Sequence, residues 1–200
     1  MRIISKIEDL TELYPDTVPA SLTKVSTRLT PLYQDWIEGA RFCVMSTVGP
    51  DCVHGSPRGD DGPVVRVQGA RTLLMPDWRG NNRLDCLRDI VEDGRIALLF
   101  MVPGSNTTVR VNGRAVLTDD LPLRDSFARK SILPATVILI EIAEVYTQCA
   151  KALMRSGLWN RNDKDSVPTV GQILADMSDG EIGGAEYDAN YEENAKPRMW

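Results

Sequence analysis

Short apolar runs separated by turn signals constrain the fold of this 200-residue chain more than any other feature. The runs 42–48 and 52–56 flank Gly-Pro-Asp at 49–51, which predicts a β-hairpin. The run 95–102 is almost entirely apolar, which predicts a strand buried on both faces. The segment 107–118 alternates between apolar and polar residues, which predicts a half-buried strand. Six or seven such strands, with helices between some of them, predict a mainly β protein with peripheral helices. An antiparallel barrel is favoured over a doubly wound parallel sheet.

The remaining elements follow from the same kinds of signal. Thr30 is a good helix N-cap, and Pro31 suits a first helical turn. Asp119 or Asp120 is expected to cap a later helix. The expected strands are 64–68, 72–75 and 136–142 extended by 145–147, a polar loop is expected over 56–63, and helices are expected over 3–13, 31–39, 120–129, 151–154 and 168–177.

Length and composition predict one soluble domain over residues 1–200, with a helical arm at 1–30 and an acidic tail at 178–200. The hydrophobic share of 42% and charged share of 26% are typical of globular proteins. The first residues carry acids early and no long apolar core, so a secretory signal is not expected, and no apolar run approaches membrane-spanning length. The tail is expected to form a loop, a short helix or an arm that folds on a partner.

The charges and cysteines narrow the partners and the compartment. The net charge is −5 and no block of lysines or arginines occurs, which disfavours binding to nucleic acid. No membrane partner is expected either. The four cysteines are scattered without a CxxC spacing, which predicts reduced thiols in a cytoplasmic protein.

The chain has a single histidine, His54, so a metal site with several histidines is excluded. A catalytic triad of the Ser-His-Asp or Cys-His type would have to use this residue. A lone histidine is more often structural, and the sequence offers it no clear partner. Asp60 and Asp61 are close in sequence, but carboxylates in a turn are usually solvated. No metal site and no catalytic residue are therefore assigned.

The best candidate for an anion site is the stretch 75–92. A polar turn containing Arg79 precedes a predicted helix that starts near Arg83, and Asn81 or Asn82 is expected to cap it. Helix N–H groups and two arginines together can bind a phosphate. An ordinary strand-turn-helix with solvated arginines explains the same residues equally well. The apolar face of the helix is expected to consist of Leu84, Leu87 and Val91.

Other nucleotide sites are not supported, because neither a GxGxxG fingerprint nor a GxxxxGK[ST] loop occurs. Further positive charge lies near strand ends and on one strand face, at Arg58, Arg110 and Arg114. Lys151 and Arg155 are one helical turn apart, with Trp159 close behind. Spacing alone favours a solvated basic face there, with Trp159 as a core or interface anchor.

Taken together, five segments give the chain a family resemblance over roughly 32–159. They are SPRGDDGP at 56–63, LLMPDWRGNNRLDCLRDI at 73–90, GRIALLFMVPG at 94–104, TVRVNGRAVLTDD at 108–120 and CAKALMRSGLW at 149–159. In combination these segments resemble the FMN-binding split-barrel proteins of the pyridoxamine 5′-phosphate oxidase-like class, in particular a bacterial branch of FMN-dependent enzymes. The resemblance implies an antiparallel split β-barrel with FMN at the interface of a homodimer.

The resemblance also suggests which residues bind the cofactor. Asn81, Asn82 and Arg83 stand at the family's phosphate-binding run, and because Asn82 replaces an arginine, Arg79 or Arg58 is expected to supply the missing charge. Thr108 stands where the family has a flavin-contacting glutamine. The segment ending at Trp159 is similar to residues that reach FMN from the partner subunit. The expected cofactor-binding residues are Ser56, Arg58, Trp78, Arg79, Asn81, Asn82, Arg83, Thr108, Arg110, Lys151, Arg155 and Trp159.

The function implied by the resemblance is that of an FMN-dependent oxidoreductase acting on a small molecule that the sequence does not identify. The family's substrate-phosphate positions have only loose counterparts in Arg124, Ser126 and Arg129, so vitamin B6 oxidation is not implied. A non-catalytic flavin-binding or sensor module is the alternative. Deazaflavin or haem could occupy the same kind of pocket, although a single histidine outside the basic residues disfavours haem.

Overall fold

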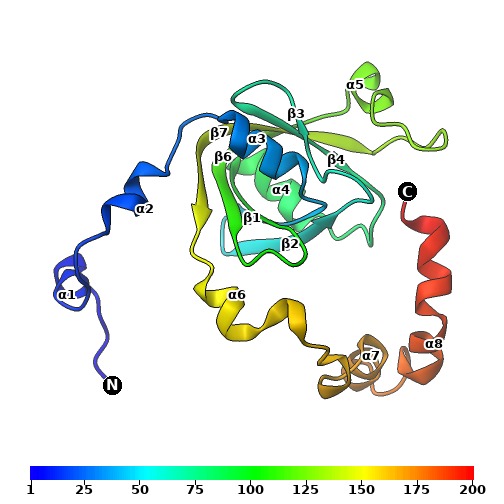
Figure 1. The fold of residues 1–200 in the computed structure, drawn as a ribbon. Coiled ribbons are helices and arrows are strands. Elements are labelled where there is room, and N and C mark those ends of the chain that lie inside the picture. Colours follow the sequence, from blue (N-terminus) through cyan, green and yellow to red (C-terminus); the bar gives the residue numbers. More distant parts are fainter.

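Seven strands form one antiparallel sheet in the computed structural model, which describes residues 1–200 (Figure 1). The sheet confirms the predicted mainly β fold, an antiparallel split barrel with peripheral helices. Its order is β2-β1-β5-β6-β7-β4-β3, so β2 and β3 are the two edges and the gap of the barrel lies between them. The strands are β1 (Phe42–Val48), β2 (Val53–Gly59), β3 (Arg66–Val67), β4 (Thr72–Asp77), β5 (Arg95–Met101), β6 (Thr108–Thr118) and β7 (Thr136–Gln148).

The helices lie around this sheet, and α4 packs against β1, β2 and β6. The N-terminal helices extend away from the barrel, whereas the chain after β7 passes beneath it and returns along α8 (Figure 1). None of the helices is both long enough and apolar enough to cross a membrane. The helices are α1 (Ile7–Thr11), α2 (Pro19–Thr23), α3 (Pro31–Glu38), α4 (Asp85–Glu92), α5 (Leu121–Asp125), α6 (Lys151–Ser156), α7 (Val170–Met177) and α8 (Gly184–Ala195), with 3-10 turns η1 (Leu158–Asn160), η2 (Lys164–Ser166) and η3 (Lys196–Arg198).

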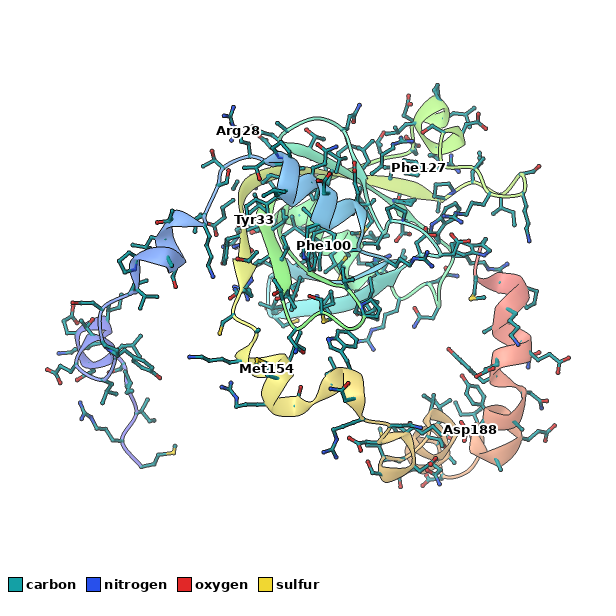
Figure 2. All side chains as sticks on the ribbon, viewed as in Figure 1. Arg28, Tyr33, Phe100, Phe127, Met154 and Asp188 are labelled. Atoms are coloured by element: carbon teal, nitrogen blue, oxygen red, sulfur yellow. The ribbon has the colours of Figure 1, made fainter.

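The core lies inside the barrel, where alternate strand residues meet. On β5 the side chains of Ile96, Leu98 and Phe100 are buried, and Figure 2 shows Phe100 among the side chains of the interior. The intervening residues of β5, such as Leu99, are only half-buried. The prediction that 95–102 is buried on both faces is therefore wrong, because no helix of this chain fully covers the outer face of β5.

Two strands are longer than predicted. The segment 56–63 was expected to be a loop, but β2 continues to Gly59. Likewise β4 continues through Pro76 to Asp77. Because β3 pairs only as far as Leu74, β4 has a free edge at Pro76, and an edge tolerates a residue without an N–H group.

The predicted cap of α4 is wrong. The helix begins at Asp85, and neither asparagine bonds to its first turn. Instead Asn81 Oδ1 accepts a hydrogen bond from Arg83 N at 3.0 Å, and Asn82 has a left-handed φ of 60°. The asparagines therefore stabilise the turn before the helix, a role that asparagine fills as readily as capping.

The predicted apolar face of α4 is also wrong. Leu84 and Val91 are 42% and 73% exposed, and the buried residues are Cys86, Asp89 and Ile90. Leu87 is only partly buried against the core. The helix is turned so that the carboxylate of Asp89 reaches polar partners on β1 and β2, which an apolar period cannot reveal.

Two predicted helix N-caps are confirmed. Thr30 Oγ1 accepts a hydrogen bond from Tyr33 N, and Asp120 Oδ2 accepts one from Leu123 N, as expected of N-caps. However, α5 ends at Asp125, well short of residue 129, and the first helix covers only part of the predicted 3–13. In the tail, α8 forms and packs against α7.

Candidate functional site

An ion pair crosses the gap of the barrel and defines the centre of the candidate site. Arg58 on β2 bonds through Nη1 to Asp77 Oδ1 on β4 at 2.5 Å. The two side chains are 20% and 12% exposed, so the pair is largely shielded from water. Because β2 and β4 belong to opposite halves of the sheet, this contact joins the two sides of the split.

Two buried polar atoms beside this ion pair have no hydrogen-bond partner. They are Nε of Arg58 and Oγ1 of Thr136, and Thr136 is directly opposite Asp77 in the ladder between β4 and β7. Both residues line a groove of about 1510 Å³ along the split. Buried polar groups in proteins are nearly always bonded, so unpaired ones in a groove are suited to a ligand that supplies the missing partners.

The groove is lined by the first group of predicted cofactor residues, namely Ser56, Arg58, Trp78, Arg79, Asn81, Asn82 and Arg83. Arg79 and Asn82 are exposed at its rim. The side chain of Arg83 is 77% exposed and pairs with Asp85 at 2.6 Å, and this contact raises its pKa. Arg83 is therefore partly neutralised by its own chain, whereas Arg58 keeps an unused donor.

Aromatic side chains close one end of the groove. Trp200 lies edge-on to Trp78 with 5.5 Å between ring centroids, and Arg129 stacks over the Trp200 ring at 4.5 Å. Trp78 Nε1 donates a hydrogen bond to Asp60 Oδ2 at 3.1 Å. The segment after α8 thus contributes a wall to the groove, which sequence reasoning did not foresee because nothing local links Trp200 to Trp78.

Asp60 and Asp61 do not form the solvated pair expected from their place in a turn. The side chain of Asp60 is 4% exposed and accepts a hydrogen bond from Arg129 Nη2 at 2.6 Å, while Asp61 is bonded to Arg129 Nη1. Burial, together with the hydrogen bond to Asp61, raises the pKa of Asp60, and the hydrogen bond from Arg129 lowers that of Asp61. Arg129 is 69 residues away from Asp60 along the chain, so no local sequence signal indicates this pairing.

The second group of predicted residues lies elsewhere: Thr108, Arg110, Lys151, Arg155 and Trp159 do not line the groove. Thr108 is opposite Gln148, at the far end of β7 from Thr136. The strand between them corresponds to roughly 40 Å of extended chain at about 3.3 Å per residue. Within one subunit the two groups therefore lie toward opposite ends of β7.

Within this second group, contacts are made among the residues near the end of β7. Arg110 Nη1 approaches the Tyr146 hydroxyl at 3.4 Å, and Trp159 Nε1 donates to the carbonyl of Ser105 at 2.7 Å. Lys151 and Arg155 on α6 are exposed. Trp159 thus anchors η1 to the loop between β5 and β6, and the two basic side chains stay free to meet another molecule.

Three solved structures are similar to part of this chain. HupZ of Group A Streptococcus is 14% identical, with a TM-score of 0.49, over 60% of this chain and 93% of that chain. General Stress Protein 26 of Bacillus anthracis is 21% identical, with a TM-score of 0.43, over 56% and 86%. An FAD binding protein of Mycobacterium smegmatis is 16% identical, with a TM-score of 0.42, over 62% and 97%.

No curated protein matches the sequence. No group of three or more histidine, cysteine, aspartate or glutamate residues is arranged to hold a metal ion. A family model described as "Pyridoxamine 5'-phosphate oxidase" matches residues 29–149, which span the whole sheet from the start of α3 to the end of β7. On the strength of that match and of its split barrel, the chain belongs to the pyridoxamine 5′-phosphate oxidase family.

Proposed function

We propose that the groove along the split binds FMN and that the protein is an FMN-dependent oxidoreductase. The observation that carries the proposal is the pair of unpaired buried atoms, Arg58 Nε and Thr136 Oγ1, in a groove with further arginines on its rim. A flavin mononucleotide offers carbonyl, ring nitrogen, hydroxyl and phosphate groups, which fit a buried N–H donor, a hydroxyl and exposed guanidinium groups.

Each residue of the groove has a chemical group suited to a different part of FMN. Arg58 is fixed by Asp77 and can donate its Nε–H into the groove without moving. Arg79 at the rim, assisted by Arg83, is suited to a phosphate dianion. Trp78 presents an aromatic ring held by Asp60. FMN would supply the hydride or electron transfer, while these side chains bind it, orient it and set the charge around it.

The same proposal includes a homodimer. The second group of predicted residues, which includes Lys151 and Arg155, is separated from the groove within one chain and would complete the groove of a partner. The outer sheet face supports this arrangement, because Val44 and Leu99 are direct neighbours across β1 and β5 and are only half-buried. Covering such apolar side chains favours association with a second copy.

The first test is a titration of the purified protein with FMN. Flavin fluorescence is expected to be quenched to saturation, and the gel-filtered complex is expected to show visible absorption. Riboflavin, which lacks the phosphate, is expected to bind at least about tenfold more weakly, since charge-assisted contacts contribute about 1.5–3 kcal/mol each. Protein that stays colourless after incubation with FMN would contradict the proposal. Mass spectrometry of any molecule released on denaturation distinguishes FMN from FAD, deazaflavin and haem.

The same complex separates the enzyme from the alternative, a flavin-binding or sensor module. For an oxidoreductase, we expect NADH, NADPH or a chemical reductant to bleach the visible band and a suitable acceptor to restore it repeatedly. Bound FMN that no reductant and acceptor can cycle would favour the sensor module, and FMN binding itself would still stand.

A second prediction tests the shared site by subunit complementation. Arg58→Lys impairs the groove, and Trp159→Ala impairs the second group, so each variant alone is expected to bind FMN weakly. If each site takes one group from each subunit, a mixed dimer of the two variants contains one intact site. Co-expression of the two variants is therefore expected to restore FMN binding to about half of the sites in the mixed dimers. Failure to restore any binding, with dimers present, would mean that each groove is complete within one chain.

A further inference from the structure

A cysteine, a histidine and an aspartate form a hydrogen-bonded chain at the β1–β2 hairpin. Cys52 Sγ is 3.3 Å from His54 Nε2, and His54 Nδ1 is 2.8 Å from Asp89 Oδ2. Thr47 Oγ1 donates a hydrogen bond to the same carboxylate oxygen at 2.6 Å. Asp89 is buried, the His54 side chain is 30% exposed, and Cys52 is exposed. The sequence offered His54 no partner because Asp89 lies 35 residues further on, in α4.

The hydrogen bonds fix the orientation of the imidazole. Burial tends to raise the pKa of Asp89, but the hydrogen bonds from Thr47 and His54 and the charge on His54 lower it overall. An ionised Asp89 can only accept a hydrogen bond, so in the neutral form of His54 the ring proton lies on Nδ1 and is donated to Asp89. Nε2 is then left as an acceptor facing Sγ of Cys52, which is the arrangement of nucleophile, base and orienting carboxylate used in covalent catalysis.

The fold holds the three side chains in place. Thr47 and His54 are direct partners in the β1–β2 ladder, so their side chains emerge on the same face toward α4. The turn leaves room for the carboxylate because residue 49 is glycine: a Cβ there would lie 2.6 Å from Asp89 Oδ1. Gly49 N also donates to the carbonyl of Cys52, which fixes the start of β2.

We propose that Cys52 is a nucleophilic thiol that undergoes disulfide exchange with low-molecular-weight disulfides. His54 Nε2 accepts the proton of Sγ as the sulfur attacks one sulfur of the disulfide. A bond forms between Cys52 Sγ and that sulfur, the disulfide bond breaks, and the departing thiolate takes up the proton. Cys52 is oxidised to a mixed disulfide and the small molecule is reduced to a thiol. Displacement at sulfur needs a thiolate, a proton acceptor and access, all of which the hairpin supplies.

Exchange with an external molecule is favoured because no second thiol of the chain is in reach. Cys43 and Cys86 are buried, and burial raises the pKa of Cys43 to about 12. Cys149 directly follows the end of β7, which pairs with the start of β6. The start of β6 pairs with the end of β5, and the end of β5 pairs with the start of β1 at Phe42, so Cys149 lies on the Phe42 side of the sheet. Cys52 lies beyond the opposite end of β1, and that strand spans about 20 Å. Cys149 is therefore too distant, and Cys43 and Cys86 are too deeply buried, to act as resolving thiols.

The test compares Cys52 with Cys149, the other exposed cysteine, inside the same full-length protein. The reduced protein is treated with oxidised glutathione at pH 7, and mixed disulfides are quantified at each cysteine by peptide mass spectrometry. Cys52 is expected to react at least about tenfold faster than Cys149, because a positioned base typically contributes about 10²-fold or more. His54→Asn is expected to reduce the Cys52 rate to that of Cys149 and to leave Cys149 unchanged.

A pH profile tests the positioning role of Asp89. The charged groups on the α4 side of the pair are Asp89 and Asp93, and the hydrogen bond from Arg95 lowers the pKa of Asp93 to about 2. Both α4-side carboxylates therefore stay ionised near neutral pH. Asp89→Asn keeps a hydrogen-bonding side chain but removes the charge, and is expected to shift the pH dependence of exchange at Cys52 alone.

Iodoacetamide serves as an uncharged second probe that needs no disulfide. Equal rates at Cys52 and Cys149, or a Cys52 rate that His54→Asn does not change, would overturn the proposal. Rapid alkylation without exchange would overturn the assignment of disulfides as the co-reactant. If Asp89→Asn fails to fold, the His54→Asn result decides alone, because His54 is partly exposed and its replacement leaves the buried carboxylate bonded to Thr47.

Discussion

Replacing Gly113 with alanine is expected to destabilise the protein by about 3 kcal/mol, at the upper end for overpacking a core. A Cβ at this position would lie 2.0 Å from the backbone oxygen of Glu141 and 3.0 Å from its carbonyl carbon. Gly113 sits at the bulge between β6 and β7, where Ala143 has no partner in the ladder. Since the obstacle is main chain in the middle of the sheet, it cannot move aside as a flexible side chain would.

Equilibrium unfolding in urea measures this effect as a lower midpoint at unchanged slope. Gly55→Ala is the matched control, because Gly55 is also a strand glycine and nothing lies within 4 Å of its added Cβ. The control is expected to change the unfolding free energy by less than about 1 kcal/mol. Similar midpoints for the two variants would mean that the bulge relaxes around the extra methyl group.

Local signals explain how much of the fold was predictable. Gly-Pro-Asp at 49–51 and the strand-like runs on either side of it predicted the hairpin of β1 and β2, and Thr30 and Asp120 marked helix starts. These signals act over a few residues and need no knowledge of the rest of the chain. The bulge at Gly113 was not foreseen, because it arises from a mismatch between two strands that meet only in the folded sheet.

The contacts within the candidate site, in contrast, could not be predicted from local sequence signals. Sequence and family resemblance indicated Arg58 and Arg79 as basic residues near a cofactor, and both line the groove. Neither could show that Asp77 pairs with Arg58 across the split, nor that Arg129 stacks over Trp200, which lines the groove. Such contacts depend on how distant strands and the C-terminal segment are packed. For that reason the sequence placed most weight on Arg83, whereas the buried Nε without a partner makes Arg58 the stronger candidate in the structure.

Arg58→Lys is expected to weaken FMN binding by roughly 1.5–3 kcal/mol, or about ten- to a hundredfold in Kd, the range for a hydrogen bond to a charged group. Lysine keeps the positive charge and can still pair with Asp77, but it has no counterpart of Nε, the atom that is buried without a partner. Fold stability should therefore change little. Arg58→Ala, by contrast, leaves Asp77 as an unpaired buried charge, which typically costs about 3–5 kcal/mol, so lysine is the informative replacement.

Two further variants make the FMN titration decisive. Arg83→Ala removes the exposed arginine that is already paired with Asp85, and Arg88→Ala removes an exposed arginine of α4 that does not line the groove. The expected order of loss in FMN affinity is Arg58→Lys, then Arg83→Ala, with no change for Arg88→Ala. A larger loss for Arg83→Ala than for Arg58→Lys would make Arg83, and not Arg58, the main contact of the cofactor. Unchanged affinity for Arg58→Lys would mean that the unpaired Nε of Arg58 belongs to a contact other than the flavin, because a donor that binds the cofactor cannot be removed without loss of affinity.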